Sequence, residues 1–382
     1  MTDASEPVLE AGGLRKDYGG RTVLDIERLE VRSGETLAVL GPSGCGKSVL
    51  LRLLNLLESP TAGTILFHGE PVRGGPGNRS LDVSRRMAMV FQDPLLFRGS
   101  VEDNVGYGLK VRKVPVAERV QRARDMLDAV GLGDLLSQNV STLSGGEAQR
   151  IAVARALVIK PEVLMLDEPF ANLDPPTRHL LQEDTRSILR EQGISAIFVT
   201  HDQEEAARMG DRILVMDNGK IAQEGLAREI FHEPETEFVA RFMGVENILR
   251  GEIRESSEGI ARVAVDGGSI EVTTDREAGR SVTLGIRPED VTLVPVADIE
   301  SRASSRNSFI GTVTAIEMRG PIARVTLACP FELVAIITWR SAVELDIETG
   351  ARFGARFKAV AVVVIDDDTR LVRDINEAEG PK

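Results

Sequence analysis

The feature that most constrains the fold is a glycine-rich segment between a buried-strand pattern and a leucine-rich helix pattern. Residues 35–40 form a mostly apolar run, and leucines recur at helical spacing over residues 48–57. The segment between them fits G-x-x-x-x-G-K-[ST] and consists of Gly41, Pro42, Ser43, Gly44, Cys45, Gly46, Lys47 and Ser48. In this pattern backbone N–H groups surround phosphate oxygens, the lysine reaches the β- and γ-phosphates, and the serine hydroxyl ligates Mg²⁺. The segment therefore predicts nucleotide binding rather than a chance glycine-rich turn.

Strand-like and helix-like patterns alternate through residues 7–245. Residues 163–166 and 196–199 are further apolar runs, each followed by a polar, helix-forming stretch. This alternation predicts a parallel sheet covered by helices on both faces. Asp167 and Glu168 close one of the strands, and the carboxyl end of a strand in such a sheet is where ligands bind. We expect Asp167 to hold Mg²⁺ through water, and Glu168 to orient and deprotonate an attacking water.

Composition excludes several other classes of protein. Of 382 residues, 42% are hydrophobic and 27% are charged, which is ordinary for a soluble globular chain. No apolar run approaches the roughly 18 residues of a membrane-spanning helix, and residues 1–7 are too acidic and polar for a signal peptide. We therefore expect any role at a membrane to be peripheral.

Charge and cysteine content narrow the partners further. The formal net charge is −13 and aromatic residues make up 4%, so nucleic acid is not an expected partner. Cys45 and Cys329 are far apart and in unlike contexts, which argues against a disulfide or a zinc site. The cysteines are consistent with a reducing cytoplasm.

From about residue 246 the pattern changes to short β-branched runs separated by turn signals such as Asp266-Gly267-Gly268. This pattern predicts a small all-β barrel region over residues 246–366, which the polar stretch 297–308 divides into two lobes. A helical turn is expected at residues 341–345, and the charged tail, residues 367–382, is expected to fray.

Residues 143–147, Leu-Ser-Gly-Gly-Glu, open an alanine-rich helix pattern in which Ser144 is the candidate N-cap. Together with the phosphate loop, Gln92, the Asp167–Glu168 pair and His201, this segment resembles the ATP-binding cassette (ABC) ATPase family. The order and spacing of the motifs make the resemblance specific. It implies an α/β P-loop NTPase domain over residues 1–245, with a helical subdomain at about 94–160, and ATP and Mg²⁺ as ligands.

The resemblance also implies a role for each matching residue. Glu168 matches the general base, and Gln92 matches a loop glutamine that contacts Mg²⁺ and senses a membrane partner. His201 matches the switch histidine that contacts the γ-phosphate. The remaining matches are Tyr18, which stacks on adenine; Ser144, Gly145 and Gly146, which cap the γ-phosphate of a second subunit's ATP; and Asp174, whose loop crosses the dimer interface.

Two positions depart from the family pattern. Val49 stands where a second serine or threonine is usual, so one hydroxyl contact to the α-phosphate is lost, at a cost of about 1 kcal/mol. Glu147 and Ala148 replace the more usual Gln-Gln or Glu-Gln pair. Neither change touches the base, the lysine or the Mg²⁺ ligands, so we expect ATPase activity to survive.

A single chain carries one phosphate loop and one such serine-glycine segment, which predicts a head-to-tail homodimer with two ATP molecules between the subunits. Residues 285–291, Gly-Ile-Arg-Pro-Glu-Asp-Val, resemble the regulatory extension of bacterial binding-protein-dependent importers. That resemblance implies two transmembrane permease subunits, a secreted or periplasmic solute-binding protein, and a place on the cytoplasmic face of the inner membrane. ABC ATPases of DNA repair and translation, the alternative, usually carry a long coiled coil or two cassettes.

The last lobe, about residues 301–366, resembles the small molybdate/tungstate-binding (Mop-like) module, which implies molybdate or tungstate as the transported solute. Sulfate, ferric iron, polyamine and sugar importers share the barrel and stay open as alternatives. By the same resemblance, Ser304, Arg306 and Lys358 are candidate oxyanion ligands for feedback across the homodimer. The alternative, that Arg306 and Lys358 only solvate the barrel surface, also stays open.

Overall fold

The computed structural model describes residues 6–75, 80–299 and 304–366. Contacts divide the chain into two compact units, Met1–Ala227 and Arg228–Lys382. The expected tail at residues 367–382 lies outside the described residues. The domain boundaries expected from the sequence stay a prediction.

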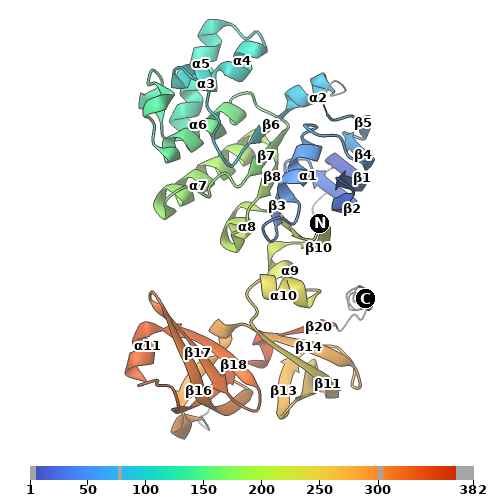
Figure 1. The fold of residues 1–382 in the computed structure, drawn as a ribbon, viewed down its shortest axis with the longest axis vertical. Helices are drawn as coiled ribbons and strands as arrows, with labels where there is room; N and C mark the ends of the chain where they lie inside the picture. The colour runs from blue at the N-terminus through green and yellow to red at the C-terminus, as the bar shows by residue number, and fades with distance from the viewer. Residues whose placement is uncertain (1–5, 76–79, 300–303, 367–382) are drawn as a thin grey trace. The chain divides into compact units, whose positions relative to one another are not determined.

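A six-stranded sheet with the order β10-β9-β3-β8-β7-β6 forms the centre of the first unit (Figure 1). β3 runs parallel to β8 and β9, β7 runs parallel to β6 and β8, and β10 alone pairs antiparallel. The expectation of a parallel sheet is confirmed. The strands are β3 (Thr36–Leu40), β6 (Met87–Val90), β7 (Val163–Asp167), β8 (Ser195–Val199), β9 (Arg212–Asp217) and β10 (Lys220–Gly225).

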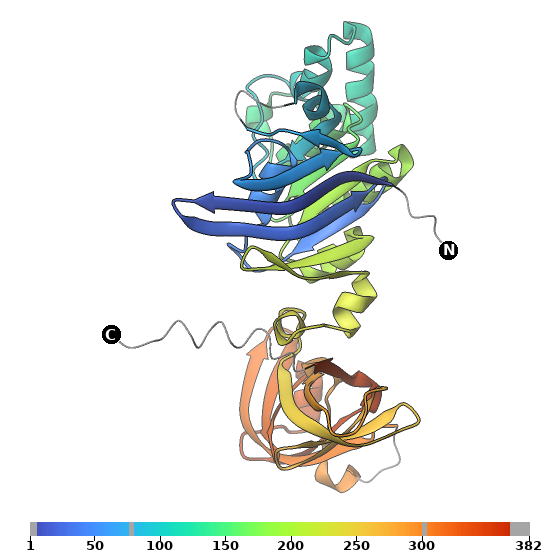
Figure 2. The same ribbon diagram turned by 90° about the vertical axis from the view of Figure 1, so that its right-hand side faces the viewer.

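A second, antiparallel sheet with the order β2-β1-β4-β5 was not expected from the strand–helix alternation. Its strands are β1 (Pro7–Tyr18), β2 (Arg21–Arg32), β4 (Ala62–Phe67) and β5 (Glu70–Val72). Figure 2 shows the long β1 and β2 strands side by side in dark blue. Only Gly19 and Gly20, with φ of 56° and 83°, separate them, so the connection is too short for a parallel crossover.

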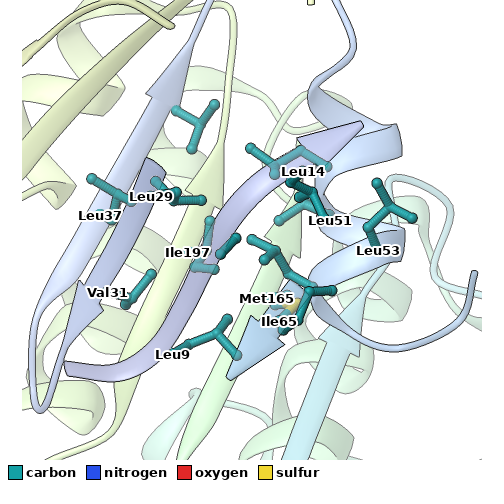
Figure 3. Close-up of a cluster of buried hydrophobic side chains, with 14 of the residues drawn as sticks. Leu9, Leu14, Leu29, Val31, Leu37, Leu51, Leu53, Ile65, Met165 and Ile197 are labelled. Carbon is teal, nitrogen blue, oxygen red and sulfur yellow. The ribbon is translucent and has the colours of Figure 1, made fainter. Parts of the chain in front are cut away.

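One apolar cluster packs the two sheets and helix α1 (Lys47–Leu54) together (Figure 3). Leu9 and Leu29 come from the antiparallel sheet, Met165 and Ile197 from the parallel sheet, and Leu51 from α1, and each is at most 2% exposed. Burial of side chains of this size stabilises the unit by roughly 1.5–3 kcal/mol each. The cluster fixes α1 against both sheets and thereby positions the loop before it.

The helices of the first unit lie along the parallel sheet and in the segment between β6 and β7. That segment contains α3, α4, α5 and α6, with short 3-10 turns at Gly133–Leu135 and Val140–Thr142. The helices are α2 (Leu81–Arg86), α3 (Val101–Val105), α4 (Tyr107–Val111), α5 (Val116–Ala129), α6 (Gly145–Leu157), α7 (Pro175–Gln192) and α8 (Gln203–Met209).

The second unit begins with α9 (Ala227–His232) and α10 (Glu237–Phe242) and continues as two antiparallel five-stranded sheets. The expected all-β region is confirmed, and the expected helical turn is α11 (Trp339–Glu344). The first sheet contains β11 (Asn247–Ser257), β12 (Ile260–Val265), β13 (Gly268–Thr273), β14 (Ser281–Ile286) and β20 (Val362–Asp366). The second contains β15 (Thr292–Pro295), β16 (Asn307–Arg319), β17 (Ile322–Ala328), β18 (Glu332–Thr338) and β19 (Arg352–Phe357).

Two polar side chains, buried Asn247 and partly buried Arg287, join the parts of this second unit. The Asn247 amide donates to the carbonyls of Ile286 and Val334, at 3.1 and 3.0 Å, and so links the two sheets. Arg287, in the Gly-Ile-Arg-Pro segment, donates to the carbonyls of Met243 and Phe231. These charge-assisted bonds hold the helices α9 and α10 to the barrel.

Candidate active site

Four loops carry the candidate residues to one edge of the parallel sheet. Residues 41–48 follow β3, Gln92 follows β6, Glu168 follows β7 and His201 follows β8. Because the four strands run parallel, their carboxyl ends lie at the same edge. The fold therefore gathers residues that are up to 160 positions apart in the sequence, as 201 − 41 shows.

The phosphate loop needs glycine at the two positions where other parts of the backbone come close. A Cβ on Gly41 would lie 2.5 Å from the Met216 carbonyl oxygen, and one on Gly46 would lie 3.0 Å from that of Val23. The φ of Gly46 is also left-handed, at 107°. A side chain at either position would displace the loop, so the glycines keep its backbone N–H groups available for phosphate oxygens.

Lys47 opens helix α1 and is only 6% exposed. Its Nζ donates to the carbonyl oxygens of Gly41, at 2.6 Å, and Pro42, at 3.0 Å. The ammonium group is thus folded over the loop, next to the backbone that is expected to hold the phosphates. A phosphate oxygen would replace these neutral carbonyl partners with a charge-assisted contact.

Ser48 and Asp167 form an oxygen-rich pair beside the loop. The Ser48 hydroxyl donates to Oδ1 of Asp167 at 3.2 Å. Burial raises the pKa of the Asp167 carboxyl. A hydroxyl and a carboxylate side by side are the oxygen donors that Mg²⁺ takes next to a nucleotide, so the residues present fit that ion.

Glu168 and His201 meet across neighbouring strands. The Glu168 backbone adopts φ of 42°, and its N–H donates to the Val199 carbonyl at 3.0 Å. A non-glycine residue in this conformation costs on the order of 1–3 kcal/mol and is held only where its surroundings fix it. Nδ1 of His201 lies 3.1 Å from Oε2 of Glu168. Glu168, the candidate base, is the more buried of the two, at 22% side-chain exposure against 62%.

Behind these side chains lies a buried carboxylate that the sequence analysis missed. Glu205, on α8, is 7% exposed, and it accepts hydrogen bonds from Thr200, at 2.6 Å, and Gln182, at 3.0 Å. A cavity of about 40 Å³, large enough for a water molecule, lies between Glu205 and Glu168. The available signal was an acidic residue on the apolar side of α8, next to Ala206.

Two of the remaining cassette residues cap helices. Ser144 caps α6 by accepting from the Glu147 N–H at 3.3 Å, as expected, and Gly145 and Gly146 form the first turn. Asp174 caps α7, where it accepts from the Thr177 N–H at 3.1 Å. Within the described residues, no hydrogen bond or ion pair joins Ser144 or Asp174 to the phosphate loop of the same chain.

Three further residues complete the set. Gln92 is exposed in the loop after β6. Val49 packs against the apolar cluster of the first unit, so its side chain serves the core. Tyr18 ends β1 with 42% exposure, and its hydroxyl donates to Oε2 of Glu58.

The candidate oxyanion residues belong to the second unit and are all exposed. Asn307 pairs with Phe357 across β16 and β19, so Arg306 and Lys358 each come one residue beyond that pair. Ser304 lies two residues before Arg306. The strand register places the two cations beside each other at the ends of β16 and β19, and no hydrogen bond links them to Ser304 among the described residues.

The sheet order and the loops at its edge define a P-loop ATPase of the cassette type. Residues 24–171 match the ABC transporter family model, and residues 303–364 match the TOBE domain model. The chain is 40% identical to the molybdate/tungstate import ATP-binding protein WtpC of Pyrococcus horikoshii over 359 residues. The matched region is 94% of this chain and 99% of that protein. The chain belongs to the family of ABC transporter ATP-binding proteins.

Other relatives share the cassette. The spermidine/putrescine import ATP-binding protein PotA of Haemophilus influenzae is 39% identical over 293 residues, which is 76% of this chain and 77% of that protein. CbiO1 of Clostridium perfringens, described as part of the ABC transporter complex cbiONQ, superposes with a TM-score of 0.56 at 32% identity, over 62% of this chain and 94% of its own. In the part of the chain that the structure describes, no helix is long and apolar enough to cross a membrane.

Proposed function

We propose that this ATPase powers the import of molybdate or tungstate as a head-to-tail homodimer. It works with two transmembrane permease subunits and a solute-binding protein, on the cytoplasmic face of the inner membrane. The observation that carries the ATPase part is the gathering of Lys47, the Ser48–Asp167 pair and the Glu168–His201 pair at one sheet edge. The solute rests on the likeness to WtpC along 94% of the chain.

The geometry supports a separate role for each of these residues in ATP hydrolysis. Tyr18 stacks on adenine, the loop N–H groups and Lys47 hold the β- and γ-phosphates, and His201 contacts the γ-phosphate. Ser48, Asp167 through water, and Gln92 would hold Mg²⁺, which would supply positive charge to the phosphate oxygens when bound. Glu168 accepts a proton as a water oxygen bonds to the γ-phosphorus and the bond to the ADP oxygen breaks.

A second copy of the chain completes each site. The start of α6, with Ser144, Gly145 and Gly146, offers backbone N–H groups and a positive helix end to an anion. Because no hydrogen bond or ion pair joins Ser144 to the phosphate loop of its own chain among the described residues, we place this segment against the ATP of the partner. Asp174, exposed at the start of α7, lies on the loop that would cross the interface.

The share of this chain that each relative matches favours an oxyanion over the other solutes. Two WtpC proteins, of Pyrococcus horikoshii and Pyrococcus abyssi, match 94% of this chain, including the C-terminal region. PotA of Haemophilus influenzae matches 76% and the Fe(3+) ions import ATP-binding protein FbpC of Photorhabdus laumondii matches 84%. Polyamine and ferric iron are therefore the alternatives to test.

Metal uptake tests this function in cells whose own copy is replaced by Glu168→Gln. Tungsten and molybdenum accumulation at low external oxyanion, measured by mass spectrometry, is expected to fall to the level of a deletion strain. Iron and spermidine uptake are expected to be unchanged. Normal tungsten and molybdenum uptake with reduced iron or spermidine uptake would overturn the assignment of the solute.

We further propose that Ser304, Arg306 and Lys358 bind cytosolic molybdate or tungstate between two copies and slow the ATPase. Hydroxyl, guanidinium and ammonium donors suit a tetrahedral dianion, and the pairing of Asn307 with Phe357 supports the closeness of the two cations. ATPase activity of the assembled wild-type transporter is expected to fall as tungstate is added. In the double variant Ser304→Ala/Lys358→Ala the activity is expected to stay unchanged. Equal inhibition of the two proteins, or none in either, would leave these residues as surface groups only.

A further inference from the structure

The Tyr18 side chain is an exposed aromatic that is anchored at one end. Tyr18 is 42% exposed at the end of β1, and its hydroxyl donates to Oε2 of Glu58. An exposed aromatic ring on a hairpin end would otherwise sample several rotamers. The hydrogen bond to a carboxylate restricts that freedom because it is charge-assisted.

Glu58 uses its other oxygen to reach the phosphate-loop helix. Oε1 accepts from Nε of Arg52 at 2.6 Å, and Arg52 lies on α1, which begins at Lys47. Lys16, on β1, places its Nζ 3.4 Å from Oε2. One carboxylate thus joins the strand that carries the aromatic ring to the helix that carries the phosphate-binding lysine.

The backbone around Glu58 is itself held in place. Its N–H donates to the Arg52 carbonyl at 3.2 Å, and Lys16 Nζ donates to the Ser59 carbonyl at 2.7 Å. Gly74 packs so closely that a Cβ there would lie 2.4 Å from the Glu58 carbonyl oxygen. The backbone that carries the Glu58 carboxylate is therefore fixed by these contacts.

The charge balance keeps Glu58 ionised. Burial raises the pKa of this carboxyl, but the hydrogen bonds from Tyr18 and Arg52 oppose it and leave the pKa below its ordinary value. Lys16 also places its ammonium 5.0 Å from the centroid of the Tyr18 ring, within the range of a cation–π contact. The ring is held at its hydroxyl and at its face by groups of opposite charge.

We propose that Glu58 is a positioning residue that presents the Tyr18 ring to the adenine base and fixes its distance from the phosphate loop. The inference rests on the proposed nucleotide site and adds to it a residue that touches neither base nor phosphate. Its expected effect is on base binding, because pre-ordering the ring removes a cost that free ATP would otherwise meet on binding. Loss of this pre-ordering is expected to weaken the affinity for ATP roughly 3- to 10-fold.

Two ligands separate this role from a general loss of structure. ATP contacts both the ring and the loop, whereas tripolyphosphate has no base and reports the loop alone. For the full-length chain with Mg²⁺, calorimetry is expected to show Glu58→Ala and Tyr18→Phe weakening ATP roughly 3- to 10-fold with tripolyphosphate unchanged. Glu58→Gln, which keeps an oxygen acceptor, is expected to lie closer to wild type. Glu70→Ala, an exposed glutamate on β5 of the same sheet, is the matched control and is expected to bind both ligands normally.

Steady-state kinetics give a second readout. The KM for ATP is expected to rise by the same factor in Glu58→Ala, while kcat changes by less. Equal weakening of ATP and tripolyphosphate in Glu58→Ala would overturn the positioning role, because it would mean a displaced α1. Unchanged ATP affinity in Glu58→Ala, with a loss in Tyr18→Ala, would overturn it and leave Tyr18 as the adenine contact. No loss in Tyr18→Ala would overturn both this inference and the proposed adenine contact.

Discussion

The imidazole Nδ1 of His201 lies 3.1 Å from Oε2 of Glu168, and the two residues follow strands that pair with each other. Asp167 pairs with Val199 at the ends of β7 and β8, so the side chains that come next leave the sheet together. The N–H of Glu168 is bonded to the Val199 carbonyl at 3.0 Å. The candidate base and the candidate γ-phosphate contact are therefore positioned by one piece of sheet, which makes both sensitive to either side chain.

Glu168→Gln is expected to reduce ATP hydrolysis by roughly 10²- to 10⁴-fold, because an amide does not accept the proton of the attacking water. ATP binding is expected to persist, so the variant should accumulate as an ATP-bound dimer in size-exclusion chromatography with ATP and Mg²⁺. The control is Glu183→Gln, an exposed glutamate on α7. Substantial hydrolysis by Glu168→Gln would remove Glu168 from the role of base.

Gln92→Ala is expected to uncouple the ATPase from the permease. Arg155 of α6 donates to the carbonyls of Pro94 and Leu95, both at 2.9 Å, so the loop that carries Gln92 is tied to the helix that Ser144 begins. Transport is expected to fall at least about tenfold, as for the loss of a typical coupling energy, while the isolated ATPase changes less. Gln121→Ala on α5 is the control. Equal loss in the isolated subunit and the whole transporter would argue for a purely catalytic role.

Glu147→Gln is expected to strengthen the ATP-dependent dimer. The Glu147 carboxylate accepts from the Ser144 N–H and hydroxyl, both at 2.8 Å, and backbone and side-chain hydrogen bonds lower its pKa, so it is charged beside the proposed γ-phosphate site. Glutamine keeps the capping box and removes the charge. Sedimentation of Glu168→Gln with and without Glu147→Gln, at low salt, is expected to show tighter association by roughly a few-fold. Weaker association of the double variant would contradict this placement.

The buried carboxyl of Glu205 is expected to make the stability of the protein depend on pH. Burial raises its pKa, and the hydrogen bond from Thr200, the nearby Asp202, Arg178 and His201 modify that shift. A carboxyl whose folded pKa is raised binds more protons folded than unfolded, so its contribution to stability falls as pH rises through that range. The Tm of wild type relative to Glu205→Gln is therefore expected to increase from pH 8 toward pH 5. A constant difference across this range would show that Glu205 does not titrate with a raised pKa.

The sequence was sufficient for the parts of the site that depend on local pattern. The strand–loop–helix pattern at residues 35–57 predicted the phosphate loop, and the strand before Asp167 and Glu168 predicted that this pair lies at a carboxyl edge of the sheet. His201 was predicted only from the resemblance to the ABC ATPase family. The antiparallel sheet of β1, β2, β4 and β5 was not predicted, because its hairpins lie within a stretch read as strand–helix alternation.

Glu58 and Glu205 were missed for a different reason. Each functions through partners that tertiary packing supplies: Tyr18 is 40 positions from Glu58, and Gln182 is 23 positions from Glu205. Glu58 lies in a loop, where no periodicity marks a residue as buried or paired, and Glu205 had only its place on the apolar side of α8 as a signal. The partners of both glutamates are identified once the elements around them are placed.

The most direct test of the central claim is ATP hydrolysis by the complete transporter in proteoliposomes, with ATP on the side of this chain and the solute-binding protein on the other. We expect binding protein loaded with tungstate or molybdate to stimulate hydrolysis, and the stimulation to vanish in Glu168→Gln. Binding protein without solute is expected to give only the basal rate. Stimulation by spermidine or ferric iron with no response to either oxyanion would contradict the account.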